Sequence, residues 1–429
     1  MQLFEIFNGI LRSIGNVFGA AWWLAVPLAL FFVFIELWVA YLENRFLKNI
    51  KWVMLEIKVP REVLKTPKAM EQIFAAAHAT YSFGFRFMEK YWEGAVEYWM
   101  SFEIVGYAGG VYFFIRLPSQ YRNMMEAAIY AQYPDAEITE REDYTELFPA
   151  VLPNQVYDFW GSDLILTKDD PYPIRTYPYF DAVDEEQRID PIAGITETMS
   201  KLREGEAIWL QILARPTGND WKDKGEELVA RLVGKKKPKQ FGFVEWFGVF
   251  MRNLLIAWRE PPDWKLGGES AKSDETKMLF LTPGERDVVK AIEDKIGKIG
   301  FECNFRFIYI DRKDSFTRSN VAAVIGALRQ FNTLNVNGFK INKKTYTKAY
   351  QPFKERKLLR RKHSLFELYK NRMFPGSLGI LRWHSGKSFI LNTEELATVY
   401  HFPSVTVESP MVRRLESKKG GPPPTLPVE

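Results

Sequence analysis

Residues 98–117, "YWMSFEIVGYAGGVYFFIRL", contain two runs of aromatic and β-branched side chains on either side of a glycine-rich break. Val, Ile, Tyr and Phe are favoured in strands, and a short break that contains glycine is typical of a hairpin turn. The break here runs from Gly106 to Gly110. The stretch therefore predicts two antiparallel strands of one sheet.

The segments around this hairpin complete a regular order of elements over residues 51–150. Upstream, "WVMLEIKV" (52–59) alternates as a half-buried strand does, and helical spacing follows Thr66-Pro67. Downstream, residues 121–129 carry a helical apolar stripe, and "AEITE" (136–140) is a short strand. The order strand-helix-strand-strand-helix-strand is that of the ferredoxin-like unit.

A second pass through the same order is expected in residues 151–340. Its predicted elements are a strand at "IRTYPYF" (174–180), a helix over 192–202, strands at "AIWLQILAR" (207–215) and "KMLFL" (277–281), the helix "TPGERDVVKAIEDKIGK" (282–298) and the strand "FECNFRFIYI" (301–310). The expected fold class is α+β, with two ferredoxin-like units and a long insertion at 216–275 in the hairpin of the second.

The insertion contains an amphipathic aromatic stretch at 241–258. Two readings are open: a helix that lies in the bilayer interface, or a helix packed on this domain or on another subunit. In the first reading, a lysine cluster before the stretch lies near anionic headgroups. The membrane-interface candidates are Phe243, Trp246, Phe247, Phe250 and Trp258, and the lysines are Lys235, Lys236, Lys237 and Lys239.

The N-terminus predicts a membrane anchor. After an N-terminal segment (1–16), an uncharged and mostly apolar run extends from Val17 to Ile35 and resumes after Glu36, which predicts a transmembrane helix over 17–42. Interfacial aromatic residues are expected at Trp22, Trp23, Trp38 and Tyr41. A cleaved signal peptide fits less well, because the apolar run is too long and no small-residue cleavage site follows it.

The charges that flank the predicted span indicate its orientation. Arg45, Lys48 and Lys51 follow it, whereas Arg12 alone precedes it. Basic residues favour the cytoplasmic side. We therefore expect a single-pass protein of the cytoplasmic (inner) membrane with its C-terminal body in the cytoplasm.

The C-terminal part of the chain is strongly basic. Residues 340–420 hold 18 Lys/Arg against 6 Asp/Glu, whereas residues 135–190 hold 15 acidic residues against 4 basic ones. We expect a basic helical region over 341–415 and a Pro/Gly-rich tail over 416–429. Its cations form either an ordinary solvated helix face or a surface for DNA (non-specific), lipid or a partner. The candidates are Lys354, Arg356, Lys357, Arg360, Arg361 and Lys362.

Motifs for catalysis are incomplete. "LRWHSGKSF" (381–389) contains Gly-Lys-Ser, but the first glycine of a P-loop would stand at Leu381. The four histidines have no metal-ligand spacing, and the single cysteine, Cys303, alternates with phenylalanines as a core residue does. We therefore expect no enzyme activity, catalytic residue, metal or cofactor.

Three stretches carry a family resemblance: "LEIKVPREVLKTPKAMEQIFAAAHA" (55–79), "FEIVGYAGGVYFFIRLPSQYRNMMEAAIYAQYPDAEITE" (102–140) and "FILNTEELATVYHFP" (389–403). They resemble the N-terminal, membrane-anchored region of bacterial type IV secretion and conjugative DNA-transfer proteins. In that family this region is often joined to a hexameric coupling-type ATPase, and the third stretch lies just before the motor. The resemblance implies partner-docking residues at Asn392, Glu394, Glu395, Tyr400 and His401.

The expected function is therefore an accessory anchor subunit of a type IV secretion-like machine. Because the chain ends at Glu429, where the motor would begin, we expect the P-loop ATPase on another polypeptide, or a truncated relative. Homo-oligomerisation is expected by analogy with ring-shaped motors. The alternative is a membrane-surface scaffold that binds anionic lipid and has no nucleic-acid role.

Overall fold

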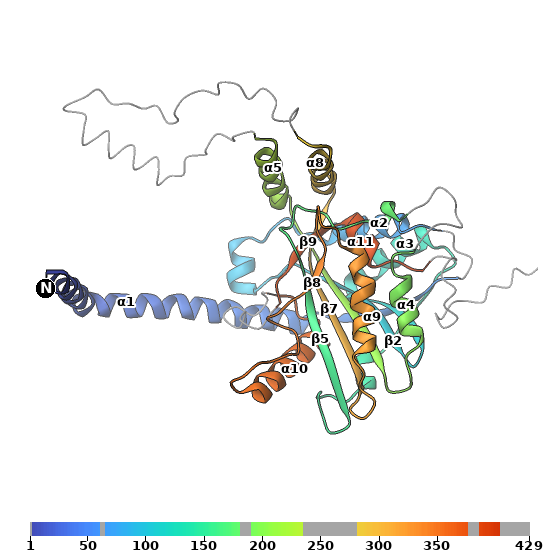
Figure 1. Cartoon of the computed structure of the whole chain (residues 1–429), viewed down its shortest axis with the longest axis horizontal. Coiled ribbons are helices and arrows are strands. Elements are labelled where there is room, and N and C mark those ends of the chain that lie inside the picture. Colours follow the sequence, from blue (N-terminus) through green and yellow to red (C-terminus); the bar gives the residue numbers. More distant parts are fainter. Residues whose placement is uncertain (1, 61–64, 181–189, 235–280, 376–385, 404–429) are drawn as a thin grey trace, which may run out of the picture.

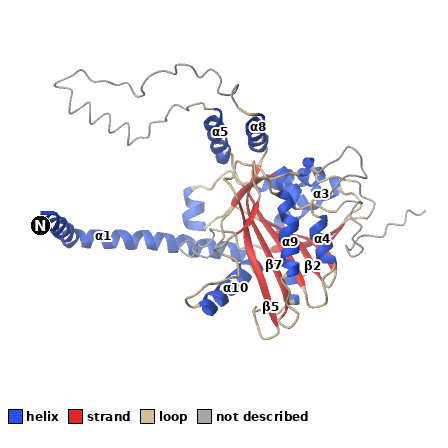
Figure 2. Ribbon diagram, viewed as in Figure 1, coloured by secondary structure: helices blue, strands red, loops and turns tan. Residues whose placement is uncertain are grey.

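The computed structural model describes residues 2–60, 65–180, 190–234, 281–375 and 386–403 (Figure 1). Within this part of the chain, nine strands form one antiparallel sheet in the order β4-β1-β3-β2-β6-β7-β5-β8, with β9 also paired to β7. Figure 2 shows these strands side by side, with helices packed against the sheet and one long helix extending away from it. The expected α+β class is confirmed.

The first half of the sheet follows the prediction element by element. Its elements are β1 (Trp52–Lys58), α2 (Lys68–Ala77), β2 (Met100–Tyr107), β3 (Gly110–Pro118), α3 (Arg122–Gln132) and β4 (Glu137–Glu140). β2 and β3 form the predicted hairpin, in which Tyr107 pairs with Gly110. The two turn residues, Ala108 and Gly109, have φ values of 47° and 79°, so the turn needs the left-handed conformation that glycine adopts easily.

The second half has the same order of elements, but several predicted assignments were wrong. Its elements are β5 (Tyr157–Leu166), α4 (Ala193–Ser200), β6 (Ala207–Pro216), β7 (Gly300–Arg312), α9 (Ser319–Leu328) and β8 (Phe339–Ile341). The predicted strand at 174–180 instead contains a 3-10 turn, η5 (Tyr177–Tyr179). The predicted last strand, 301–310, is part of the third, β7, because β6 and β7 pair as a hairpin from Ala207 opposite Ile310 to Pro216 opposite Phe301.

The insertion therefore lies between β6 and β7 and is longer than predicted. It contains α5 (Asp220–Val233) and α8 (Pro283–Ile296), which lie side by side (Figure 1). α8 was predicted as a helix but belongs to this connection rather than to the repeated unit. Most of the predicted strand 277–281, the aromatic stretch 241–258 and the lysines 235–239 lie outside the described residues.

The two halves share a single sheet because their edges are hydrogen-bonded. β2 and β6 pair antiparallel from Met100 opposite Ala214 to Tyr107 opposite Ala207. One sheet face packs on α2, α3, α4, α9 and α11 (Thr393–Val399) in the larger core. The other packs on α10 (Lys354–Lys370) and the segment 144–152. β9 (Phe389–Asn392) leads into α11, so the described parts of the predicted C-terminal region, 341–375 and 386–403, contact both faces of the sheet.

The N-terminal helix α1 (Gln2–Asn49) is continuous through the predicted boundary at residue 17 and through Pro27. It projects from the body (Figure 1). Its segment Val26–Asn49 is, among the described residues, the one helical stretch long and apolar enough to cross a membrane. Side chains from Val26 to Phe34 are mostly exposed, whereas Leu42 is buried.

Candidate functional site at the base of helix α1

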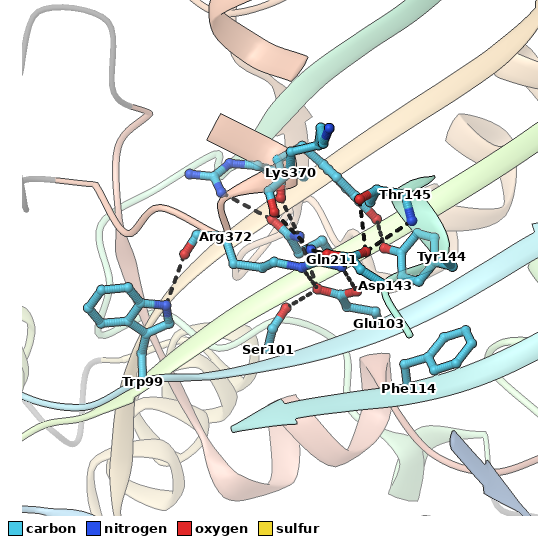
Figure 3. A network of polar contacts seen from close by, with 12 residues as sticks. Trp99, Ser101, Glu103, Phe114, Asp143, Tyr144, Thr145, Gln211, Lys370 and Arg372 are labelled. Carbon is cyan, nitrogen blue, oxygen red and sulfur yellow. Dashed lines mark hydrogen bonds and ion pairs between the residues drawn. The ribbon is translucent and has the colours of Figure 1, made fainter. Parts of the chain in front are cut away.

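A buried arginine, Arg372, is the centre of a polar network behind the sheet (Figure 3). It lies in the turn that follows α10, and its side chain is 0% exposed. Its guanidinium donates to both carboxylate oxygens of Glu103, at 3.0 and 3.2 Å, and to Asp143 Oδ1 at 2.9 Å. Two carboxylates thus hold one guanidinium in a fixed position, as its planar fork of donors allows.

Neighbouring groups satisfy the rest of Glu103. Ser101 Oγ donates to it, and Gln211 Nε2 donates to its Oε1 at 3.0 Å. Burial opposes its negative charge, but Arg372, together with hydrogen bonds from Ser101 and Tyr144, outweighs that effect, so the pKa of Glu103 is lowered. Burial likewise raises the pKa of Tyr144 and Tyr369, whose hydroxyls lie 2.6 Å apart beside the network.

The network extends to a second buried arginine, Arg306 on β7. Its Nη1 donates to Gln211 Oε1 and to the carbonyl of Leu368, both at 3.0 Å, and its Nε lies 3.3 Å from Asp163 Oδ1. Gln211 therefore joins the two arginine clusters. Asp163 Oδ2 and both side-chain polar atoms of Asn304 have no hydrogen-bond partner within the described residues.

The Gly-Lys-Ser stretch lies against this second cluster. A Cβ on Gly386 would lie 2.1 Å from Asp163 Oδ2 and 3.0 Å from Asn304 Nδ2, so the backbone there approaches the buried carboxylate closely. Ser388 Oγ donates to Glu302 at 2.6 Å. The backbone at Gly386 and the hydroxyl of Ser388 thus face carboxylates, whose negative charge disfavours a bound phosphate.

The Arg372 turn is packed against the base of α1. Trp99 Nε1 donates to the carbonyl of Arg372 at 2.9 Å, and the Trp99 ring lies 6.0 Å from Phe374 and 5.7 Å from Trp52. Leu47 of α1 packs on the same cluster. The last turns of α1 therefore contact, through one aromatic cluster, the segment that Arg372 fixes to the sheet. The arrangement can hold the helix and the C-terminal segment in one position.

The predicted partner-docking residues lie elsewhere, and most are structural. Asn392 caps α11 by accepting from the Glu395 amide at 2.9 Å, and Glu395 forms a fully buried ion pair with Lys295 at 3.0 Å. Tyr400 donates to the Phe114 carbonyl at 3.1 Å, and His401 lies 3.0 Å from Asp190. The docking prediction was wrong for these four residues, because their side chains are buried inside the body.

Glu394, the fifth of that set, binds Lys298 at 2.6 Å and borders a groove of about 540 Å³. The groove is lined by α8, residues 173–179, residues 333–336 and the start of α11.

The predicted basic residues of α10 differ in their exposure. Lys354, Arg356, Lys357 and Arg360 are exposed on the first turns of α10. Arg361 donates to the Lys348 carbonyl. Lys362 is buried, pairs with Asp158 and lies 5.7 Å from the Phe159 ring centroid, so its assignment to a free basic patch was wrong.

The predicted membrane-interface residues of α1 are placed as follows. Trp23, Trp38, Tyr41, Arg45 and Lys48 are exposed, and the side chain of Trp22 lies outside the described residues. The insertion candidates Phe243, Trp246, Phe247, Phe250 and Trp258, with Lys235, Lys236, Lys237 and Lys239, are also outside the described part.

Sequence reasoning missed the two arginine clusters, although a signal was present. Glu103 in "SFEIV", Asp163 in "GSDLIL" and Arg306 in "CNFRFIY" are charged residues inside otherwise apolar strands. A charge in a strand that is covered on both faces needs a buried partner. The pattern could have identified the residues, but not which acid meets which arginine.

Comparison with known proteins places the chain in a family. Among curated proteins, none matches it. A family model described as a domain of unknown function, DUF8128, matches residues 44–414. The match begins in the last turns of α1 and covers both halves of the sheet, the arginine clusters and α11. The chain therefore belongs to the DUF8128 family.

Proposed function

We propose that this protein is a membrane-anchored, non-catalytic adaptor that holds a partner at the membrane surface. The observation that carries the proposal is the packed joint between Leu47 of α1, the aromatic cluster of Trp99 and Phe374, and the buried Arg372 turn. A helix that enters the bilayer and continues into a body of buried ion pairs is suited to fixing that body in place. α1 supplies the span, and the sheet supplies the platform.

The body is proposed to lie on the cytoplasmic side of the inner membrane. Arg45 and Lys48 are exposed at the body end of α1, which supports this orientation under the positive-inside rule.

We also infer that each half of the sheet is a ferredoxin-like unit. The support is the pairing order, β4-β1-β3-β2 in one half and β8-β5-β7-β6 in the other, with every neighbouring pair antiparallel. This is the arrangement that a split βαβ unit takes.

The partner is proposed to be a P-loop ATPase of a type IV secretion-like machine, with a homo-oligomer of this chain as its collar. The resemblance of residues 55–79, 102–140 and 389–403 supports the machine. The four exposed cations of α10 support an acidic partner surface or the DNA that such a machine moves.

The test is affinity purification of the full chain from membranes in mild detergent after crosslinking. We expect a P-loop ATPase to co-purify with the wild type and to be depleted with a variant in which Lys354, Arg356, Lys357 and Arg360 are glutamine. Replacing four exposed lysines far from α10, for example Lys201, Lys222, Lys224 and Lys290, controls for net charge. Recovery of the protein alone, before and after crosslinking, would count against the adaptor proposal.

A scaffold that binds anionic lipid is the second candidate. The observation that favours it is the position of α10, which lies on the side of the body from which α1 leaves (Figure 1). Binding of the full chain to duplex DNA, with an affinity that falls steeply with salt, would support the first candidate. The second candidate would be supported if the wild type bound anionic lipid but no DNA, and if the α10 variant lost the lipid binding.

A further inference from the structure

The segment 82–94 carries several large exposed apolar side chains that belong to none of the buried clusters of the body. Phe83, Phe87, Met88 and Trp92 are 88%, 69%, 58% and 65% exposed, although they are large apolar side chains. Isolated apolar residues are normal on a protein surface, but four within ten residues form a patch of the kind that contacts another apolar phase.

This patch is fixed to the membrane helix. Trp38 Nε1 of α1 donates to the carbonyl of Tyr91 at 3.1 Å. Gly94, which ends the π-helical turn η2 (Glu89–Glu93), has φ +69°, and a Cβ there would lie 2.4 Å from the carbonyl carbon of Leu42. The chain can approach α1 this closely only because residue 94 has no side chain. The patch is therefore held at the level of Trp38 to Leu42.

That level is where α1 passes from exposed to buried surroundings. Leu30, Phe31, Phe32 and Phe34 are all more than half exposed, whereas Leu42 is 6% exposed within the body. Trp38 and Tyr41 lie between the two regions, as aromatic residues do at the boundary between acyl chains and headgroups. Trp38 and Leu42 are about 6 Å apart along the helix axis at 1.5 Å per residue. The apolar patch is thus beside the expected membrane boundary.

We propose that residues 83–92 form a second membrane contact, in which Phe83, Phe87, Met88 and Trp92 insert into the acyl-chain boundary of the bilayer that α1 spans. In Figure 1 this turn is the light-blue helical segment close to α1 on the side of the body that faces the N-terminus. Interfacial elements of this kind bury their apolar faces about 5–10 Å into the headgroup and acyl boundary. The occupant of the patch is phospholipid. The inference rests on the proposed anchoring by α1.

A short interfacial turn beside a span has a mechanical consequence. A single helix leaves a body free to rotate about the helix axis and to tilt, whereas a second contact a short distance from that axis restricts both movements. The turn would therefore set the orientation of the sheet relative to the membrane.

The test measures the depth of single labels in the full chain reconstituted into vesicles of phosphatidylcholine and phosphatidylglycerol. The native Cys303 is buried, so a thiol-reactive fluorophore reports on introduced cysteines, with the wild type as the labelling blank. Labels at Phe87→Cys and Trp92→Cys are compared with Leu30→Cys inside the proposed span and with Leu334→Cys, a 97% exposed residue of the body. Quenchers are phospholipids that carry nitroxides at shallow or deep acyl positions.

We expect shallow nitroxides to quench the labels at 87 and 92 and deep nitroxides to quench the label at 30, while the label at 334 is quenched by neither. If the labels at 87 and 92 behave like that at 334 while that at 30 is quenched, the second contact is wrong and the anchoring stands. If the label at 30 is not quenched, both proposals fail. Disulfide crosslinking between copies at position 87, with no lipid quenching, would assign the patch to a second copy of the chain.

Discussion

Two arginines, Arg372 and Arg306, are buried behind the same sheet and are joined through Gln211, yet their acids behave oppositely. Glu103 accepts from Arg372 through both of its oxygens, and from Ser101 and Gln211, and its pKa is lowered. Asp163 faces Arg306 at 3.3 Å through one oxygen and leaves the other without a partner in the described part of the chain. Burial outweighs this weaker pairing, and the pKa of Asp163 is raised.

Burial cannot explain the difference, because both acids are 0% exposed. The number and geometry of the donors must explain it, since each hydrogen bond to a carboxylate favours its charged form and desolvation opposes it. The Glu103 cluster is therefore the firm attachment of the Arg372 turn beside α1. The Asp163 cluster is the less satisfied of the two.

The largest expected effect is that of removing Arg372. Arg372→Met leaves Glu103 and Asp143 without their cation, and breaking a buried pair in this way costs about 3–5 kcal/mol of unfolding free energy. Arg306→Met should cost less, because Asp163 meets Arg306 through one oxygen at 3.3 Å, whereas Glu103 accepts from Arg372 through both of its oxygens. Urea unfolding of the full chain in detergent, followed by tryptophan fluorescence, measures both losses.

A double variant separates the lost pair from lost packing. Glu103→Leu combined with Arg372→Met removes the fully buried pair and leaves only the partly exposed Asp143 without its cation, so it should recover much of the loss caused by Arg372→Met alone. Equal losses for Arg372→Met and Arg306→Met would show that the two clusters do not differ in the way proposed.

A smaller and pH-dependent effect should distinguish the two acids. The pKa of Glu103 lies below its ordinary 4.5, so its stabilising contribution is present above pH 4.5 and is lost as the pH falls through the folded-state value. The pKa of Asp163 lies above its ordinary 3.8, so its contribution is present below pH 3.8 and is lost as the pH rises through the folded-state value.

Glu103→Gln should therefore lower the unfolding free energy at pH 7, by about 1.5–3 kcal/mol for hydrogen bonds to a charged group. The difference in unfolding free energy between Glu103→Gln and the wild type should become smaller below pH 4.5. Asp163→Asn should cost less than Glu103→Gln at pH 7, because burial disfavours the charged form of Asp163, and its stability relative to the wild type should fall toward pH 3.8. Urea midpoints between pH 3 and 8 test this, and parallel pH profiles for the two variants would contradict it.

The sequence predicted the first half of the sheet better than the second for a local reason. In 51–150 each strand and helix shows its own period, and the two strands joined by the short turn pair with each other as a hairpin. In the second half, β5 was missed because buried Ser162 and Asp163 interrupt its apolar pattern. The long connection between β6 and β7 also contains α8, a helix with a complete capping box, which we predicted as the second helix of the repeated unit.

The site was harder to predict because its contacts are distant in sequence. Arg372 and Glu103 are 269 residues apart, and no local pattern pairs them. Two errors were avoidable. Asn392 and Glu395 have capping-box spacing, which indicates a helix start rather than a docking surface. Lys362 shares the i, i+3, i+4, i+7 positions of Leu365, Phe366 and Tyr369, which identifies it with the buried face of α10.

The cations of α10 are either exposed or, like Lys362, buried in an ion pair, and replacing the exposed ones should have the smallest effect on stability. Lys354, Arg356, Lys357 and Arg360 are exposed, so replacing all four with glutamine should change the unfolding free energy by no more than about 0.5 kcal/mol per residue. Lys362→Gln should cost more than any one of them, because it leaves Asp158 without its buried partner. Binding should show the reverse order. The fourfold variant should lose affinity for DNA or anionic vesicles, with a weaker dependence on salt, whereas Lys362→Gln should bind as the wild type does. If Lys362→Gln lost binding as well, the ion pair with Asp158 would have to open when the ligand binds, and buried charges on this helix could no longer be separated from its binding surface.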